Sequence, residues 1–115
     1  MQPTQANPVS FSELILDIQL LKAVTQLGYE KPTAVQYQAI PSILEDKDLL
    51  VSAETGSGKT AAFLLPTLHN LLIRPSEKVG IRALILAPTR ELAQQTFSQC
   101  QLLSQFTDLT SGLIT

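Results

Sequence analysis

The sequence predicts an α/β fold in which a parallel sheet is flanked by helices. Two short apolar runs, at residues 48–53 and 81–87, have the length and composition of buried strands, and residues 109–115 are expected to begin a third strand. Helical patterns separate these runs, and strands that alternate with helices form right-handed units around a parallel sheet. Of the 115 residues, 44% are hydrophobic, so the chain can form one small domain with a core and is too apolar to be disordered.

Two helices are expected before the first strand, and residues 11–28 form the first of them. Its apolar side chains recur at spacings of four, three and three and make one stripe: Leu14, Ile18, Leu21 and Val24. Ser10 and Glu13 have the spacing of a capping box at its start, and Gly28 lies where a helix stop belongs. The polar residues 1–10 are expected to be a flexible lead.

The other helices are expected over residues 34–45, 60–73 and 91–106. Thr33 can cap the first of these three, and Glu91 places a negative charge in the first turn of the last, where the helix dipole favours it. Pro41 and Pro66 lie inside the first two and should kink or divide them, because proline removes a backbone donor and clashes with the preceding turn.

Charge and cysteine content limit the kinds of protein and the cellular compartments that fit the sequence. Eight basic against ten acidic residues give a net charge of −2, which argues against a protein that grips nucleic acid through bulk positive charge but allows a local basic site. Cys100 is the single cysteine, so no internal disulfide can form and a reducing compartment is the simplest interpretation. No charged signal-peptide start and no apolar run of membrane-spanning length is present, and we therefore expect a soluble, cytoplasmic protein.

Residues 53–60, with the sequence AETGSGKT, lie between a predicted strand and a predicted helix, where a phosphate-binding loop belongs. The two glycines free successive backbone N–H groups to converge on an anion, and the helix adds its positive end. Lys59 can reach the β- and γ-phosphates of a nucleotide, and the Thr60 hydroxyl can ligate Mg²⁺. Ala53 replaces the first glycine of the usual pattern, and a glycine-rich structural turn is the alternative interpretation.

Two other segments allow a structural or a functional interpretation. In GYEKPTAVQ, residues 28–36, the structural interpretation assigns Tyr29 to packing and Gln36 to a solvated helix face. In PTRELAQQ, residues 88–95, the start of a helix can hold a phosphate, or Arg90 can pair with an acid at a structural turn. His69 has no cluster of metal ligands near it, and Cys100 is expected to be packed rather than reactive.

Together, and in this order, GYEKPTAVQ, AETGSGKT and PTRELAQQ closely resemble the Q motif, motif I and motif Ia of the DEAD-box RNA helicase family. The family also has an isolated aromatic residue 17 positions before the Q-motif glycine, which here is Phe11. Its motif I begins with alanine, as this loop does; Ala34 and Val35 are mild departures from its usual Q motif. The resemblance runs from Phe11 to the end of the chain. It implies a partial RecA-like P-loop domain, with residues 1–10 as the lead, 11–37 as the Q-motif region and 38–115 as the truncated N-terminal part of the ATP-binding domain.

The resemblance also implies roles for particular residues. Gln36 would recognise adenine, Tyr29 would stack on it, Lys31 would approach the base, and Phe11 would brace the Q-motif segment. Motif I would complete the ATP site, with Lys59 and Thr60 as catalytic residues and Thr60 holding Mg²⁺ through ATP: Ala53, Glu54, Thr55, Gly56, Ser57, Gly58, Lys59 and Thr60. RNA would be held through its backbone, with little sequence preference, near Pro88, Thr89 and Arg90.

The family resemblance implies an ATP-dependent RNA helicase that couples ATP binding and hydrolysis to local unwinding of RNA duplexes. The D-E-A-D and S-A-T motifs and the second RecA-like domain are absent from these 115 residues, so we expect the chain by itself to be inactive and marginally stable or prone to aggregate. Two alternatives remain at this point: a short non-catalytic protein that binds a nucleotide or a partner, and another P-loop ATPase such as a DNA translocase.

Overall fold

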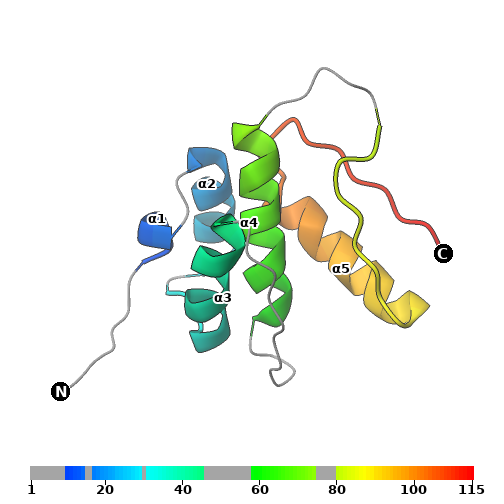
Figure 1. The fold of residues 1–115 in the computed structure, drawn as a ribbon, viewed down its shortest axis with the longest axis horizontal. Coiled ribbons are helices and arrows are strands. Elements are labelled where there is room, and N and C mark those ends of the chain that lie inside the picture. Colours follow the sequence, from blue (N-terminus) through cyan, green and yellow to red (C-terminus); the bar gives the residue numbers. More distant parts are fainter. Residues whose placement is uncertain (1–9, 15–16, 30, 46–57, 75–79) are drawn as a thin grey trace.

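The computed structural model of the chain describes all residues except 1–9, 15–16, 30, 46–57 and 75–79. Within the described part, regular secondary structure consists of helices (Figure 1). Their bounds are α1 Phe11–Leu14, α2 Ile18–Gln26, α3 Ala34–Leu44, α4 Lys59–Ile73 and α5 Arg90–Leu103.

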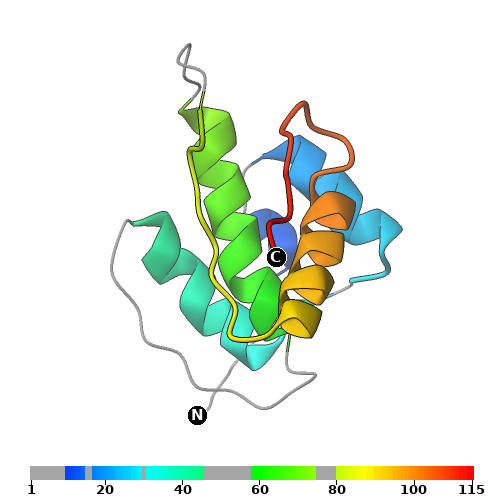
Figure 2. The ribbon, with the colours of Figure 1, turned by 90° about the vertical axis from the view of Figure 1, so that its right-hand side faces the viewer.

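Helix α4 is the centre of the packing. It contacts α3 most extensively and also contacts α2 and α5, while α2 packs on α5 and α1 packs on α3 (Figures 1 and 2). The largest fully buried side chains come from four of the five helices and include Leu20, Ile40, Leu64, Leu65 and Leu103. Each buried side chain of this size contributes about 1.5–3 kcal/mol through the hydrophobic effect, so the helical layer has a core of its own.

The helix expected over residues 11–28 is wrong as a single element, because two helices cover it. Asp17 begins the second one: its carboxylate accepts hydrogen bonds from the backbone N–H groups of Gln19 at 2.8 Å and Leu20 at 3.2 Å. A short polar side chain competes with the helical backbone in this way and favours a cap over a helix interior. The expected capping interaction of Ser10 is replaced by a 2.6 Å hydrogen bond between the Ser10 and Ser12 hydroxyls.

The predicted helix stop at Gly28 is confirmed. Gly28 has a φ of +83°, its N–H donates to the Thr25 carbonyl at 3.1 Å, and the N–H of Tyr29 donates to the Val24 carbonyl at 2.9 Å. These two bonds are those of a Schellman motif, which needs a left-handed residue just after the helix. The motif turns the chain so that Tyr29 leaves α2 in a fixed direction.

The later helices agree with their predictions to within three residues at each end. Thr33 caps α3, which ends one residue before the predicted limit, and α4 begins one residue earlier than expected. Helix α5 begins one residue earlier, at Arg90, and ends three residues earlier, at Leu103. Neither Pro41 nor Pro66 divides its helix, because packing of α3 against α4 offsets the loss of one backbone hydrogen bond.

The structure describes two of the three expected strand segments. Residues 48–53 lie outside the described residues, whereas 81–87 and 109–115 are described and adopt non-helical conformations without strand pairing. Both segments lie on the same side of the helices, which faces the viewer in Figure 2. The prediction of a buried strand is wrong for residues 81–87, because Ile81, Leu84 and Leu86 are 78%, 72% and 85% exposed. A strand is stabilised by pairing with a neighbouring strand, and neither described segment is paired with the other.

Candidate nucleotide and nucleic-acid site

Gly58 joins the candidate phosphate loop to α4. Of residues 53–60, the structure describes Gly58, Lys59 and Thr60, and the predicted roles of Ala53, Glu54, Thr55, Gly56 and Ser57 lie outside the described residues. Gly58 is the N-cap of α4 and has a φ of +84°. A Cβ at this position would lie 2.3 Å from the Gln36 side-chain nitrogen, so both the backbone conformation and the close approach require glycine.

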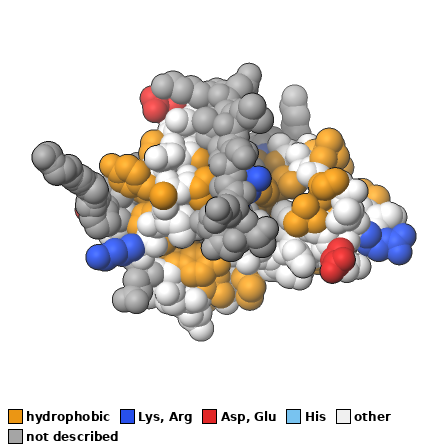
Figure 3. Space-filling model, turned by 90° about the horizontal axis from the view of Figure 1, so that it is seen from below, with side chains coloured by type: hydrophobic (Ala, Val, Ile, Leu, Met, Phe, Trp, Pro, Cys, Tyr) orange, Lys and Arg blue, Asp and Glu red, His pale blue; other side chains and the backbone are white. Residues whose placement is uncertain are grey.

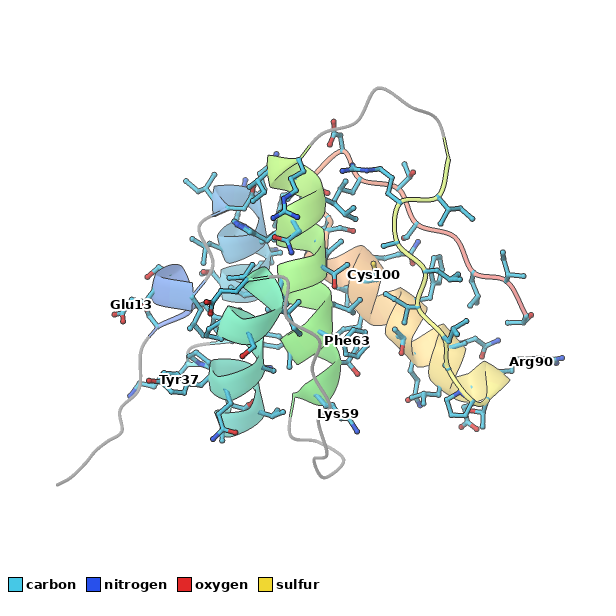
Figure 4. The ribbon with its side chains drawn as sticks, viewed as in Figure 1. Glu13, Tyr37, Lys59, Phe63, Arg90 and Cys100 are labelled. Carbon is cyan, nitrogen blue, oxygen red and sulfur yellow. The ribbon has the colours of Figure 1, made fainter. Side chains whose placement is uncertain are left out.

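Lys59 and Thr60 form the first turn of α4. The Lys59 side chain is exposed and extends from the start of the helix, and Thr60 is partly exposed (Figure 4). The first N–H groups of a helix have no partner within it, and a helix of 15 residues has a positive N-terminal end. An ammonium group, a hydroxyl and a helix N-terminus therefore occur together, which is the chemistry that binds a phosphate and its metal ion.

Gln36 is the second component of the site, and it connects α3 to α4. Its side-chain oxygen accepts a hydrogen bond from the backbone N–H of Thr33 at 3.0 Å, and its Nε2 donates to the Gly58 carbonyl at 3.1 Å. The Thr33 hydroxyl accepts from the Gln36 N–H at 3.4 Å, which completes a capping box. The interpretation of Gln36 as a solvated residue is wrong, because the side chain is 3% exposed.

The carboxamide of Gln36 retains hydrogen-bonding capacity beyond these two contacts. A carboxamide has two N–H donors and an oxygen with two lone pairs, and the contacts with Gly58 and Thr33 use one of each. Among the described residues, these contacts leave one donor and one acceptor unused, which is the pair that the N7 and amino group of adenine require. Gln36 can therefore hold the start of α4 and pair with a base through the same side chain.

Tyr29, in the same Q-motif segment, is half-buried. Its ring packs on the hydrophobic core, with its centroid 6.3 Å from that of Phe11 and the two planes at 33°. Phe11 is buried, so the contact agrees with its expected role as a brace. The Tyr29 hydroxyl accepts a hydrogen bond from Nε2 of Gln99, on α5, at 2.5 Å. Lys31, within the same segment, is exposed.

Pro88, Thr89 and Arg90 are exposed at the start of α5. The Thr89 hydroxyl accepts a hydrogen bond from the Leu92 N–H at 3.1 Å, so it caps the helix. The Arg90 side chain extends outward from the end of the molecule (Figure 4), and the described residues provide no salt-bridge partner for it. Within that part of the chain, the alternative in which Arg90 pairs with an acid at a structural turn is not supported.

Basic side chains do not form a continuous patch on the described surface seen in Figure 3, where lysine and arginine side chains lie apart from one another among hydrophobic and neutral groups. This agrees with the net charge of −2. Contact with a nucleic acid through this surface would depend on local groups, such as the start of α5, rather than on a broad positive field.

Two other residues, His69 and Cys100, have structural interpretations. His69 is buried on α4, and within the described part of the chain its Nδ1 atom has no hydrogen-bond partner. No group of possible metal ligands occurs in that part either. Cys100 is half-buried on α5; burial raises the pKa of its thiol, and a hydrogen bond with Ser111 opposes this effect. No helix in the described part of the chain is long and apolar enough to cross a membrane.

Sequence reasoning missed Gln99, which contacts Tyr29 across 70 positions of the chain. No motif marks Gln99, and its place on α5 shows no pattern that points to Tyr29. The structure thus brings Gln36 to the start of α4 and Tyr29 to α5, while Lys59 and Arg90 lie at the starts of two different helices (Figure 4).

Comparison with known proteins assigns a family to this arrangement. Residues 33–115 match the model of the DEAD/DEAH box helicase family. A probable ATP-dependent RNA helicase, ddx27, of Dictyostelium discoideum is 58% identical over 91% of this chain and 13% of its own length. The ATP-dependent RNA helicase SrmB of Haemophilus influenzae is 51% identical over 95% of this chain and 25% of its own length. The chain therefore spans a quarter or less of these relatives.

Solved structures agree with the family match. The RNA helicase Prp28 of Chaetomium thermophilum, bound to ADP, superposes with a TM-score of 0.80 at 44% identity, over 91% of this chain and 26% of that one. A DEAD box protein of Methanococcus jannaschii superposes with a TM-score of 0.73 at 40% identity, over 84% of this chain and 26% of its own. The predicted fold class, a partial RecA-like α/β domain, is confirmed by these neighbours.

Proposed function

The chain belongs to the DEAD/DEAH box helicase family, and from this premise we propose that it supplies the ATP-binding part of an ATP-dependent RNA helicase. The observation that carries the proposal is the hydrogen bond from Gln36 to the Gly58 carbonyl, which joins the base-reading residue to the start of the phosphate-binding helix. The relatives named ATP-dependent RNA helicases support the same function.

In this proposal ATP binds across the starts of α3 and α4. Gln36 pairs with the adenine edge, Tyr29 stacks on the ring, and the exposed Lys31 approaches the base. Lys59 and the N–H groups of Gly58 and its neighbours hold the phosphates. The exposed ammonium group, the Thr60 hydroxyl and the helix N-terminus fit a nucleotide with Mg²⁺, which neutralises phosphate charge when it is bound at Thr60.

RNA binds, in the same proposal, at the start of α5. Because the Thr89 hydroxyl already caps that helix, the contacts to an RNA phosphate come from the backbone N–H groups at Thr89 and Arg90 and from the Arg90 guanidinium, beside Pro88. Contacts of this kind hold the backbone and carry little sequence preference. We propose that the whole protein, with a second RecA-like domain, couples ATP turnover to local duplex unwinding in the cytoplasm.

The proposal is tested by nucleotide preference. Guanine presents acceptors at both positions that Gln36 would pair with, so the protein should bind ATP more tightly than GTP. Replacement Gln36→Ala should reduce the ratio of the two affinities toward one, a loss of roughly 5- to 150-fold if the pair contributes about 1–3 kcal/mol. The measurement is isothermal calorimetry with ATP and GTP in the presence of Mg²⁺.

Gln36→Ala also removes the capping contacts of α3 and can unfold part of the protein. Unfolding lowers the apparent affinities for ATP and GTP equally, so the ratio of the two affinities reports on base recognition alone. Gln38→Ala, at an exposed glutamine of the same helix, is the matched control and should keep the preference for ATP. Equal affinity of the unaltered protein for ATP and GTP would favour another class of P-loop ATPase.

A further inference from the structure

Gln99 holds the hydroxyl end of Tyr29, and nothing in the three motifs assigns a role to Gln99. We infer that Gln99 is a positioning residue for the adenine site: it fixes the Tyr29 ring in the orientation that stacks on the base. The inference rests on the proposed function, because it takes Tyr29 as the stacking residue.

Tyr29 is constrained at three places in the described structure. Its backbone N–H closes the Schellman motif with the Val24 carbonyl at 2.9 Å, which sets where the residue leaves α2. One side of its ring meets the buried Phe11 ring and the hydrophobic core. Its hydroxyl accepts the hydrogen bond from Gln99.

The third constraint differs from the other two, because it holds the outer end of the ring. Backbone and core contacts place the base of the side chain and one part of the ring but leave its outer end in a half-exposed environment. A bond to the hydroxyl fixes the position of that end and so restricts rotation about the Cα–Cβ bond. A ring that is already oriented loses less conformational entropy when a base stacks on it, and pre-organisation of this kind increases affinity without a new contact.

The donor is itself held in place. Gln99 lies on α5, a helix of 14 residues that contacts both α2 and α4. It is half-buried rather than at a free surface, and its partner lies 70 positions away in the chain. The contact therefore ties the Q-motif segment to the helix that begins at the proposed RNA contacts, Thr89 and Arg90.

A purely structural tie between α5 and the Q-motif segment is the competing explanation, and two ligands separate it from positioning. ATP uses the base and the phosphates, whereas inorganic tripolyphosphate uses the phosphate site alone. A loss of positioning weakens ATP binding and leaves tripolyphosphate binding unchanged. A general loss of structure weakens both.

The experiment measures the dissociation constants of MgATP and of magnesium tripolyphosphate for the protein at its natural length. Tyr29→Phe keeps the ring and removes the hydroxyl, and Gln99→Leu keeps the size and removes the donor. Each should weaken ATP binding roughly three- to tenfold, the effect of one lost hydrogen bond, with tripolyphosphate unaffected. The double variant should be no weaker than either single one, because both remove the same contact.

Two more variants complete the design. Gln99→Glu should bind ATP about as tightly as the unaltered protein and more tightly than Gln99→Leu, because the Tyr29 hydroxyl can then donate a hydrogen bond to the carboxylate. Gln101→Leu, at an exposed glutamine of the same helix, is the matched control and should behave as the unaltered protein.

Tyr29→Ala tests stacking by Tyr29 separately from positioning by Gln99. If Tyr29→Ala weakens ATP binding while Tyr29→Phe and Gln99→Leu do not, stacking stands and positioning by Gln99 is overturned. Positioning is also overturned if Gln99→Leu weakens both ligands equally, or if the double variant loses the sum of the two single effects. If Tyr29→Ala leaves ATP affinity unchanged, Tyr29 does not stack, and that part of the proposed function fails with the inference.

Discussion

Cys100 shows how burial sets the chemistry of one residue. It is the single cysteine, it lies half-buried on α5, and burial raises the pKa of its thiol from the ordinary value of 9.0 against the opposing hydrogen bond with Ser111. The thiolate is the reactive form, so alkylation of the folded chain should reach half of its maximal rate at a higher pH than alkylation of the chain unfolded in urea. The measurement is the rate of iodoacetamide labelling between pH 7 and 10.5.

The same shift fixes the sign of its effect on stability. A thiol whose pKa is raised on folding does not lower the free energy of unfolding below about pH 9, where the thiol is protonated in both the folded and the unfolded state. As pH rises through the folded-state pKa, the unfolded chain has released its proton first, and the free energy of unfolding falls. In Cys100→Ala, the free energy of unfolding should therefore decrease less as the pH rises. A labelling midpoint in the folded chain at or below that of the unfolded chain would show that burial does not control the thiol.

Among the site residues, sequence reasoning found those that depend on local pattern. Gly58 and Gln36 belong to short motifs whose spacing reflects backbone geometry, and the structure brings the two into direct contact. Sequence reasoning did not show that Gln36 is buried, because the burial of Gln36 depends on how α3 packs against α4. It also missed Gln99, because a pair of residues 70 positions apart leaves no mark on either local sequence.

At the scale of elements, the start of α2 carries a clear energetic prediction. Asp17 accepts two backbone N–H groups there, and removal of an N-cap side chain costs about 0.5–2 kcal/mol. Asp17→Ala should lower the free energy of unfolding by about 1 kcal/mol, as measured by urea denaturation followed by circular dichroism. The effect should be larger at low salt, because the carboxylate also interacts with the helix dipole.

Asp17→Asn is the conservative comparison, since asparagine caps helices about as well as aspartate, and it should lose much less stability. Asp108→Ala removes an exposed carboxylate that lies outside the helices and serves as the matched control. Equal losses in Asp17→Ala and Asp108→Ala would mean that net charge, rather than the cap, accounts for the change.

The helices were easier to predict than the strands for a physical reason. A helix satisfies its own backbone, and signals such as Thr33 before α3 and Gly28 after α2 lie within a few residues of its ends. A strand in a parallel sheet depends on neighbours that are distant in sequence. Apolar and β-branched composition marked residues 81–87 as a strand, although the described structure leaves this segment and residues 109–115 unpaired.

At the scale of the whole molecule, the helices and the extended segments differ sharply in burial. The helices share a core, whereas Leu86 and Ile114 are each 85% exposed and lie in segments on one side of the helices (Figure 2). Extended backbone with exposed apolar side chains is a template for pairing with another chain. This asymmetry, rather than the net charge of −2, should determine how the 115-residue chain behaves in solution.

We therefore expect the 115-residue chain to self-associate, with a mass by light scattering that exceeds 12.5 kDa and rises with concentration. Leu86→Lys should shift the chain toward the monomer, because a charge on the extended segment opposes edge-to-edge pairing. Ile18→Lys alters a side chain that is 78% exposed on α2 and is the matched control, since a helix offers no free backbone for pairing. A monomer at every concentration, with a cooperative thermal transition, would show instead that the helical core alone is sufficient for a stable domain.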